Sequence, residues 1–411
     1  MVLIRKRHSH LPPGPKGLPM VGSLHRLGSR PHEALAALAE THGCLMTLQL
    51  GFVTTIVVSS SEMATEVLQK NNLAFAGCTV IEVMKIKSHY NGSLVWAQMG
   101  PRWQALRRLC NTQLFTPQRL DTLQARRYQK VHEMVELIQQ TEQVVDIGRV
   151  AFVTALNLVS NMIFSTEMDV VWSIMEVSGA PNLVDYFPML RGLDPQGLKG
   201  RSNKLFERLH QLLNVMIDER IQSREKGGVA KGDFIGVILD SNQENGVEFR
   251  RNEILALLTL FTVGSDTSST SVEWAMAELL CNPDKMAIAK MELSRTLVPE
   301  HAQVLINYWA IGRDPKVWGN PTTFLPERFL ASNVDYKGKD FQFIPFGVGR
   351  RICPGLPLGV HMVHLMLVSL LHYFDWELPD GLKAEEMDMR DKFGVTLQKL
   401  VRLRLIPRQG S

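Results

Sequence analysis

The sequence predicts a mainly α-helical protein with a small β-rich lobe. Apolar residues recur at helical spacing over long stretches, and the longest of these patterns covers residues 252–280. Near the N-terminal end, residues 45–50 and 54–59 alternate in polarity or carry β-branched side chains, which is typical of short strands. The chain has 411 residues, of which 45% are hydrophobic, so it can bury a large core.

The β-rich lobe is expected to begin as a helix, a hairpin and a second helix. Residues 31–42 carry apolar side chains at helical spacing, and Gly43 is expected to end this helix. Gly51 joins the two strands, and Ser61 is expected to cap a helix over residues 62–70.

Prolines and a Gly-Gly turn separate the helical patterns in the middle of the chain. Hydrophobic residues in this part are more often core than pocket residues, so none is assigned to substrate binding. The remaining expected elements are helices over 96–115, 146–164, 202–225 and 234–239, a strand over 304–309, loops over 313–318 and 324–329, and an apolar helix beginning at Leu356.

The composition excludes some classes of protein. Lys plus Arg is 45 and Asp plus Glu is 41, and the resulting net charge of +4 is too small and too dispersed to indicate nucleic-acid binding. The 5 cysteines are scattered, without a C-x-x-C pair, so no disulfide framework is predicted. A reducing, cytosol-facing location fits this cysteine usage best.

The N-terminal segment, residues 1–30, is basic and rich in proline. A short apolar stub precedes the basic cluster Arg5–Arg7, and a stiff proline spacer follows at Leu11–Pro15. No run of about 18 apolar residues occurs, so no transmembrane helix is predicted. An ordinary solvated basic start is the alternative.

The most informative stretch is a loop sequence that runs straight into the apolar helix. Its glycines permit tight turns, and Cys353 falls just before the helix begins. Backbone N–H groups at the helix start, together with Arg350 and Arg351, are expected to favour a Cys353 thiolate, which can bind a metal. A buried structural cysteine is the alternative. The pattern F-x-x-G-x-R-x-C-x-G is formed by Phe346, Gly349, Arg351, Cys353 and Gly355.

This pattern resembles the haem-binding loop of the cytochrome P450 monooxygenases, in which the cysteine is a ligand of the haem iron. The resemblance runs from Leu11 to Pro407, and residues 304–315 and 343–347 resemble the plant microsomal A-type group, in the terpenoid-hydroxylase branch that includes geraniol 8-hydroxylase. It implies the cytochrome P450 fold, with residues 31–411 as one helical domain around haem b and Cys353 on the iron.

Trp103 and Arg107 lie four residues apart and therefore share one helix face. They match a W-x-x-x-R helix that, in the family, donates hydrogen bonds and charge to a haem propionate. A planar guanidinium pairs well with a carboxylate. A surface stack of Trp on Arg is the alternative.

An acid followed by an alcohol interrupts the longest helical pattern at Asp266 and Thr267, and Gly264 loosens the same turn. These residues resemble the family's [AG]-G-x-[DE]-T motif and depart from it only at Val263. The resemblance implies that Thr267 hydrogen-bonds the bound dioxygen and that Asp266 helps to relay protons to it. A bent structural helix is the alternative.

One part of the family pattern is predicted to be missing. The family's Glu-x-x-Arg helix pairs with an arginine that corresponds to Arg328, but Glu292 and Arg295 have the context of the preceding helix and are interpreted as a surface pair. We therefore expect the Glu-x-x-Arg helix and part of the β-lobe to be absent, which would leave Arg328 without its partner. A smaller loss is expected near residues 168–171.

The resemblance implies a monooxygenase that inserts one oxygen atom from O2 into a small hydrophobic, terpenoid-like substrate. Electrons would come from NADPH through NADPH-cytochrome reductase, and the enzyme would lie at the cytosolic face of the endoplasmic reticulum membrane, with the membrane anchor absent from this chain. Three alternatives stay open: a haem-thiolate isomerase or dehydratase, an inactive or haem-free truncated product, and a haem-binding protein without turnover. The Asp266 and Thr267 pair argues against the isomerase.

Overall fold

The computed structural model describes residues 11–86, 89–122, 124–141, 143–160, 168–226, 235–236, 238–240, 249–282, 304–329, 332, 334 and 336–409. Helices dominate and three small sheets accompany them, so the predicted fold class is confirmed. The α-helices are α1 Pro31–His42, α2 Ser61–Thr65, α3 His89–Gly92, α4 Pro101–Leu109, α5 Pro117–Thr122, α6 Gln124–Gln139, α7 Ile147–Ser160, α8 Met168–Gly179, α9 Leu183–Tyr186, α10 Leu198–Glu225, α12 Arg251–Cys281, α14 Tyr308–Ile311 and α15 Leu356–Tyr373.

The strands form two three-stranded sheets and one hairpin. In the first sheet β2 lies between β1, which is antiparallel to it, and β4, which is parallel. In the second sheet β8 lies between β3 and β5, and the hairpin pairs β6 with β7. The strands are β1 Leu45–Leu50, β2 Val53–Val58, β3 Val145–Asp146, β4 Val304–Ile306, β5 Phe374–Glu377, β6 Asp391–Lys392, β7 Gln398–Lys399 and β8 Arg404–Gln409.

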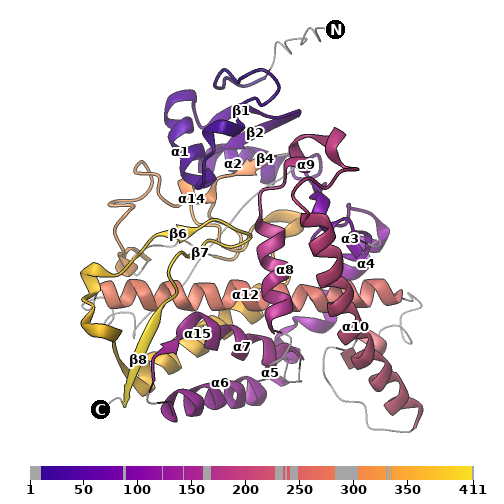
Figure 1. Cartoon of the computed structure of the whole chain (residues 1–411), viewed down its shortest axis with the longest axis vertical. Coiled ribbons are helices and arrows are strands. Elements are labelled where there is room, and N and C mark those ends of the chain that lie inside the picture. Colours follow the sequence, from indigo (N-terminus) through magenta and orange to yellow (C-terminus); the bar gives the residue numbers. More distant parts are fainter. Residues whose placement is uncertain are drawn as a thin grey trace.

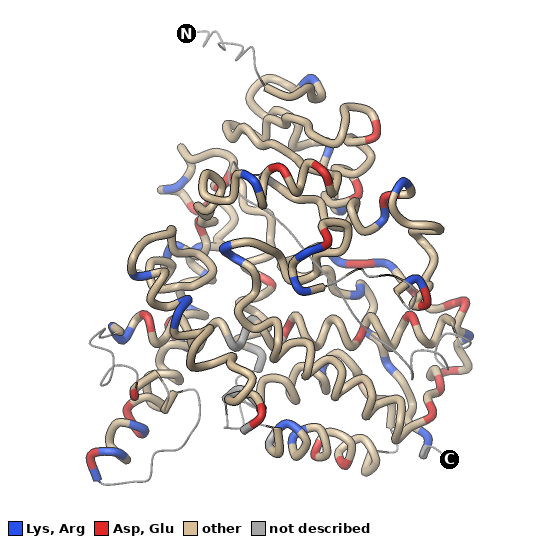
Figure 2. The backbone as a smooth tube through the Cα atoms, turned by 180° about the vertical axis from the view of Figure 1, so that it is seen from behind, with Lys and Arg blue, Asp and Glu red and all other residues tan. Residues whose placement is uncertain are grey.

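Helix α12 crosses the whole molecule and organises the main core (Figure 1). It packs against α7 and α15, and α15 in turn packs against α6. The sheet of β1, β2 and β4 lies with α1 at the other end of the molecule, over a separate small core. Basic and acidic residues are interleaved along the chain (Figure 2), in agreement with the dispersed charge that the sequence shows.

Two helix starts differ from the sequence prediction. The hydroxyl of Ser60, and not that of Ser61, caps α2 by accepting a hydrogen bond from the Met63 N–H at 3.3 Å. The helix expected over 96–115 begins only at Pro101, because proline is favoured in a first turn, where its missing N–H costs nothing. Both α2 and α4 then continue into a π-helical turn.

The strand expected over 304–309 is too long. Strand β4 ends at Ile306, because the Asn307 side chain accepts a hydrogen bond from the Ala310 N–H at 3.1 Å and starts α14. The expected helix over 252–280 is confirmed with one more residue at each end.

The N-terminal residues that the structure describes, from residue 11 onward, contact the first sheet. The Thr47 N–H donates to the Pro13 carbonyl at 2.8 Å, and Gly22 forms a β-bridge with Leu50. A Cβ atom on Gly14 would lie 1.8 Å from the Thr47 carbonyl oxygen, so strand β1 requires glycine there.

One described helix bears on the expectation that the chain has no transmembrane helix. Helix α15 is long and apolar enough to cross a membrane, by length and composition. Its buried side chains, among them Met362 and Met366, lie in the main core, which is the packing of a core helix.

Candidate functional site

The Cys353 loop and helix α4 form one unit. A guanidinium N–H of Arg107 donates to the Ile352 carbonyl at 2.5 Å, although the two residues lie far apart in sequence. Arg351 donates to the carbonyls of Ala97 and Val95 at 2.5 and 3.1 Å, so two successive residues just before the cysteine are held in place. The predicted Arg107, Arg351 and Cys353 are therefore brought together.

The glycines of the loop are required by its shape. Gly347 and Gly349 have φ angles of +68° and +65°, in the left-handed region that side-chain-bearing residues avoid. This turn lets the Cys353 N–H donate to the Phe346 carbonyl at 2.9 Å. Gly355 lies beside the cysteine, since a Cβ atom on it would be in van der Waals contact with the Cys353 sulfur at 3.8 Å.

Trp103 is buried and supports the loop from α4. Its indole N–H donates to the Leu94 carbonyl at 2.9 Å, and the Arg351 guanidinium lies 5.0 Å from its ring centroid. The Trp–Arg stack considered from the sequence therefore exists, but with Arg351 and not with Arg107. The predicted contact of Trp103 and Arg107 with a propionate remains a prediction.

The electrostatics of Cys353 differ from the expectation. Burial raises the pKa of its thiol, whereas N–H groups of Gly355 and Leu356 and the charge of Arg107 lower it. The charge that lowers this pKa comes from Arg107, whereas Arg350 donates to Asn72 and Arg351 to backbone carbonyls, so the expected role of Arg350 and Arg351 stays a prediction. A coordinating metal would itself remove the thiol proton.

Arg107 is the cation whose charge lowers the pKa of the Cys353 thiol. Burial lowers the pKa of its guanidinium, and Cys110 and Cys353 raise it. The neighbouring Cys110 is fully buried, and burial raises its thiol pKa to about 12.

The acid and the alcohol of α12 point to different partners. Asp266 is fully buried and accepts hydrogen bonds from Thr396 at 3.0 Å and Gln398 at 3.2 Å. The Thr267 hydroxyl donates to the Gly264 carbonyl at 3.0 Å and is exposed. The structure thus places Asp266 and Thr267 on neighbouring faces of α12 without a contact between their side chains.

Gly264, Thr267 and Ser271 form a narrow exposed stripe on this helix, although its other described central residues are buried. The stripe carries only small side chains, and a Cβ atom on Gly264 would meet nothing within 4 Å. Helix α12 also packs against α15, whose N-terminal end follows Cys353 directly. The small stripe leaves room for a flat ligand on this helix.

The residues fit a haem group. A cysteine sulfur that receives two backbone N–H groups could bind the iron, and the half-buried guanidinium of Arg107 suits a carboxylate. The small stripe would face a planar ring without large side chains in the way. This chemistry favours haem over the alternative of a purely structural cysteine.

We expect Gly264→Ala to stabilise the haem-free chain and to weaken haem binding. Replacing a mid-helix glycine by alanine stabilises by about 0.5–1 kcal/mol where the added methyl group has space, as it has here. Gly200→Ala in α10 is the matched control, since its methyl group would meet only Asp194, at 3.5 Å. Denaturant unfolding should show a similar gain for both variants, whereas haem titration should show lower affinity only for Gly264→Ala. Unchanged haem affinity would place the haem away from this stripe.

Arg328 is not left without partners. Its guanidinium donates to the carbonyls of Leu325, Gly319, Asn320 and Thr323 at 2.8–3.1 Å. Backbone carbonyls of its own loop therefore accept the hydrogen bonds of Arg328, and the expected lack of its Glu-x-x-Arg partner stays a prediction. Glu292 and Arg295 lie outside the described residues, and α8 begins at residue 168, where a smaller loss was expected.

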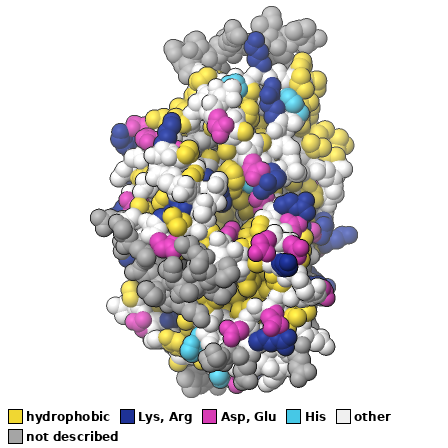
Figure 3. Space-filling model, turned by 90° about the vertical axis from the view of Figure 1, so that its left-hand side faces the viewer, with side chains coloured by type: hydrophobic (Ala, Val, Ile, Leu, Met, Phe, Trp, Pro, Cys, Tyr) yellow, Lys and Arg dark blue, Asp and Glu magenta, His cyan; other side chains and the backbone are white. Residues whose placement is uncertain are grey.

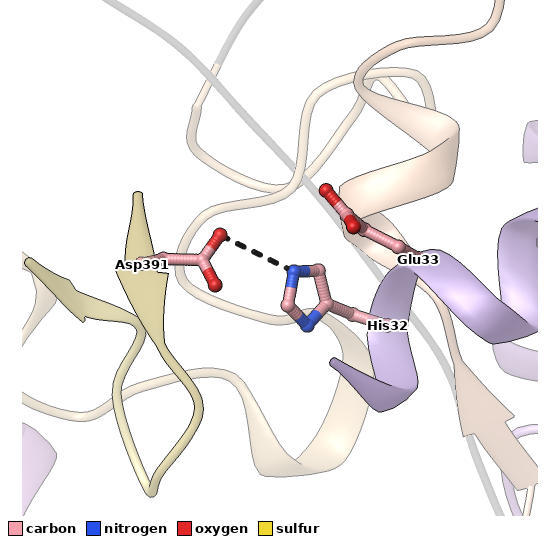
Figure 4. Close-up of side chains that lie close together, drawn as sticks. All are labelled: His32, Glu33 and Asp391. Atoms are coloured by element: carbon pink, nitrogen blue, oxygen red, sulfur yellow. Dashed lines mark ion pairs between the residues drawn. The ribbon is translucent and has the colours of Figure 1, made fainter. Parts of the chain in front are cut away.

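A second cluster of possible metal ligands lies where α1, from the N-terminal part of the chain, meets β6, from the C-terminal part. His32 of α1 faces Asp391 of β6 with 3.4 Å between Nε2 and Oδ2, and Glu33 lies nearby (Figure 4). Arg30 already donates to both carboxylate oxygens of Asp391, at 3.1 and 2.6 Å, and pairs with Glu33 at 2.7 Å. Arg30 pairs with both acids, so these residues form an ion-pair network.

Sequence reasoning missed three contributors to the site. These are the Ile352 carbonyl that accepts from Arg107, and the Thr396 and Gln398 side chains that hold Asp266. Polar residues two apart on a strand share one face, which could have indicated a paired role for Thr396 and Gln398. Their partner could not be read from this pattern, because it lies 130 and 132 residues away.

Comparison with known proteins gives matches over nearly the whole chain. The sequence model described as Cytochrome P450 matches residues 12–301 and 284–403. Geraniol 8-hydroxylase of Swertia mussotii is 41% identical over 466 residues, which covers 98% of this chain and 94% of that protein. Geraniol 8-hydroxylase of Catharanthus roseus is also 41% identical, over 98% and 95% of the two chains. Geranylhydroquinone 3''-hydroxylase of Arnebia euchroma is 36% identical, over 98% of this chain and 95% of that protein.

The alignment with the first of these relatives is longer than the chain. It spans 466 residues, whereas the chain has 411, so the relative has internal residues at positions where this chain has none. The two segments of the family match meet at residues 284–301, next to the predicted loss of the Glu-x-x-Arg helix.

Proposed function

Since this chain belongs to the cytochrome P450 family of haem-iron monooxygenases, we propose that it hydroxylates a small, terpenoid-like hydrophobic substrate with O2 and electrons from NADPH. The observation that supports the substrate class is the 41% identity to two geraniol 8-hydroxylases over 98% of the chain. We assign the catalytic domain to residues 31–411, with residues 11–30 docked on its β-rich lobe.

The proposed cofactor is haem b, with Cys353 as the axial ligand. Bound haem would supply the activation of O2 and the insertion of one oxygen atom into a C–H bond. The loop amides of Gly355 and Leu356 would hold the sulfur, and Arg107 would pair with a propionate carboxylate. Phe346, Gly349, Arg351 and Trp103 would keep this loop in shape through the contacts described above, and Gly264 would leave room for the ring.

Thr267 and Asp266 are the proposed catalytic residues. The Thr267 hydroxyl is exposed on the small stripe, where it can donate a hydrogen bond to a bound ligand. Burial raises the pKa of Asp266, so it can hold or release a proton closer to neutral pH than an ordinary aspartate. The pair also argues against the isomerase or dehydratase, which would not require delivered protons.

The proposed electron donor is an NADPH-cytochrome reductase that binds beside the Cys353 loop. Arg108 at the end of α4 and Arg350 in the loop are both exposed, and the hydrogen bond between Arg107 and Ile352 brings these two segments together. Two exposed cations near the sulfur favour an acidic partner surface.

We place the enzyme on the cytosolic face of the endoplasmic reticulum membrane, with its apolar edge against the lipid. This edge joins the N-terminal segment, the β1–β2 turn and the α9 region, because the Phe52 N–H donates to the Tyr186 carbonyl at 3.0 Å and the Gly51 N–H to Val21 at 3.1 Å. Figure 3 shows exposed hydrophobic side chains on the upper part of the face that it presents. The exposed residues of the apolar edge are Leu18, Met20, Phe52, Leu183, Met189 and Leu193.

An inactive, haem-free product is the second candidate, and the relative's extra internal residues favour it. The four backbone carbonyls that accept hydrogen bonds from Arg328 argue against this second candidate, because the guanidinium has hydrogen-bond acceptors without the Glu-x-x-Arg pair. A haem-binding protein without turnover would bind haem but would consume no NADPH on substrate addition.

The test uses the full-length recombinant chain with a plant reductase. We expect the reduced carbon monoxide spectrum of a thiolate-bound haem, a spectral shift on addition of geraniol or a related monoterpene, and a hydroxylated product that depends on NADPH. Absence of haem uptake would contradict the enzymatic proposal. Haem uptake without any substrate shift across mono- and diterpenes would contradict the substrate class.

A further inference from the structure

The hairpin of β6 and β7 lies along α12 and holds the acid of the proposed catalytic pair. Lys392 pairs with Gln398 in this hairpin, and Thr396 precedes β7 by two residues. Thr396 lies in the bend of the hairpin and Gln398 lies in β7, and both side chains bind the same group.

That group is the Asp266 carboxyl. The Thr396 hydroxyl donates to Oδ2 at 3.0 Å and the Gln398 amide donates to Oδ1 at 3.2 Å, so each carboxyl oxygen has its own neutral donor. Asp266 has no solvent exposure, and these two bonds replace the water that an exposed carboxylate would bind. The carboxyl is thus turned toward the hairpin, whereas Thr267 donates within its own helix.

The hairpin is itself fixed at both ends. At its turn, a Cβ atom on Gly179 of α8 would lie 2.4 Å from the Val395 nitrogen, so the two backbones are in direct contact. At its base, Arg30 and His32 hold Asp391 (Figure 4). The donors of Asp266 are therefore positioned by α1 and α8, and also by α12, whose Trp274 indole N–H donates to the Leu397 carbonyl at 2.7 Å.

The charged groups near Asp266 do not replace these donors. Arg402 acts from the same C-terminal segment to lower the pKa of Asp266, and burial has the larger, opposite effect. Glu273, further along α12, accepts from the Leu403 N–H, and Lys399 donates to the Asp388 carbonyl. Thr396 and Gln398 are the hydrogen-bond donors that oppose the effect of burial.

We propose that Thr396 and Gln398 are positioning residues for Asp266, which orient its carboxyl group and stabilise its ionised form from the C-terminal hairpin. The role in proton supply rests on the proposed function, whereas the two bonds are a property of the chain itself. Movement of the hairpin would therefore change the orientation and the ionisation of the Asp266 carboxyl group.

Unfolding of the full chain over a range of pH tests the bonds. Thr396→Val removes the hydroxyl at nearly constant volume, and Thr396→Ser keeps it. An aspartate whose pKa is raised in the folded state loses stability as pH rises through that pKa, and losing a donor raises the pKa further. We therefore expect Thr396→Val to lower Tm by roughly 2 °C more at about pH 8 than at about pH 5. Thr396→Ser should follow the wild type, and Gln398→Leu should behave like Thr396→Val.

The same measurement in an Asp266→Ala background separates the bond from packing. With the acceptor gone, Thr396→Val should lose its pH-dependent effect. An equal loss of Tm at both pH values, or the same pH dependence without Asp266, would overturn the proposal.

Catalysis is judged separately on the haem-loaded enzyme with reductase. We expect Thr396→Val to lower the ratio of hydroxylated product to consumed NADPH several-fold and to shift its pH profile upward, with rescue by Thr396→Ser. An unchanged ratio and pH profile would refute the catalytic part of the proposal. If the wild type bound no haem, the proposed function would fail, and the unfolding data would still decide whether the hairpin sets the ionisation of Asp266.

Discussion

Replacing Cys353 by serine is expected to abolish the carbon monoxide spectrum of a thiolate-bound haem and to reduce hydroxylation at least a thousandfold. A serine hydroxyl is a poor substitute, because it stays protonated where a coordinating thiol loses its proton. The loop itself should survive, since the Cys353 N–H donates to the Phe346 carbonyl through the backbone alone. Reduced difference spectra and product formation measure the two effects.

Cys78→Ser is the matched control for this variant. Cys78 is also partly buried, and the charge of Arg351 lowers its thiol pKa while burial raises it. The Cys78→Ser variant should still bind haem and hydroxylate substrate, because Cys78 is not predicted to be a ligand of the iron. Unchanged pigment and oxidation in Cys353→Ser would remove the basis of every functional assignment made for this chain.

Gly179→Ala is expected to destabilise the protein by about 1–3 kcal/mol, the usual cost of overpacking. The added methyl group would lie 2.4 Å from the Val395 nitrogen and 2.8 Å from the Gly394 backbone, and backbone atoms cannot move aside as a side chain can. The hairpin must shift, and with it the donors of Asp266. Denaturant unfolding gives the stability, and the ratio of product to consumed NADPH should also fall.

Gly192→Ala provides the comparison, since its added methyl group would meet nothing within 4 Å. Its stability should stay within about 0.5 kcal/mol of the wild type, as for most surface substitutions. Equal stability of the two variants would show that the contact between α8 and the hairpin turn is looser than the structure indicates.

The spacing of residues was sufficient to predict the elements that depend on local chemistry. The periodic apolar residues of α12 gave its extent to within one residue at each end, because a helix buries one stripe at a fixed repeat. Gly43 ends α1 with a φ angle of +95°, which follows from the freedom of glycine. The β4 boundary was missed, because a capping bond from Asn307 competed with strand propensity.

The electrostatics of the site could be predicted less well. Arg350 and Arg351 adjoin Cys353 in sequence, but their guanidinium groups donate to other acceptors, and the charge of Arg107 from α4 lowers the pKa of the Cys353 thiol. The charge that matters for a buried group depends on which side chains the fold brings to it, and adjacency in the chain does not give this.

The sequence by itself determined the helical class, the family and the cysteine that would bind haem, because these depend on residue types at fixed local spacing. Only the tertiary structure decided that Arg107 reaches the cysteine loop and that Thr396 and Gln398 hold Asp266. Such contacts join residues more than a hundred positions apart. They form only when packing has already placed their backbones, so no local pattern encodes them.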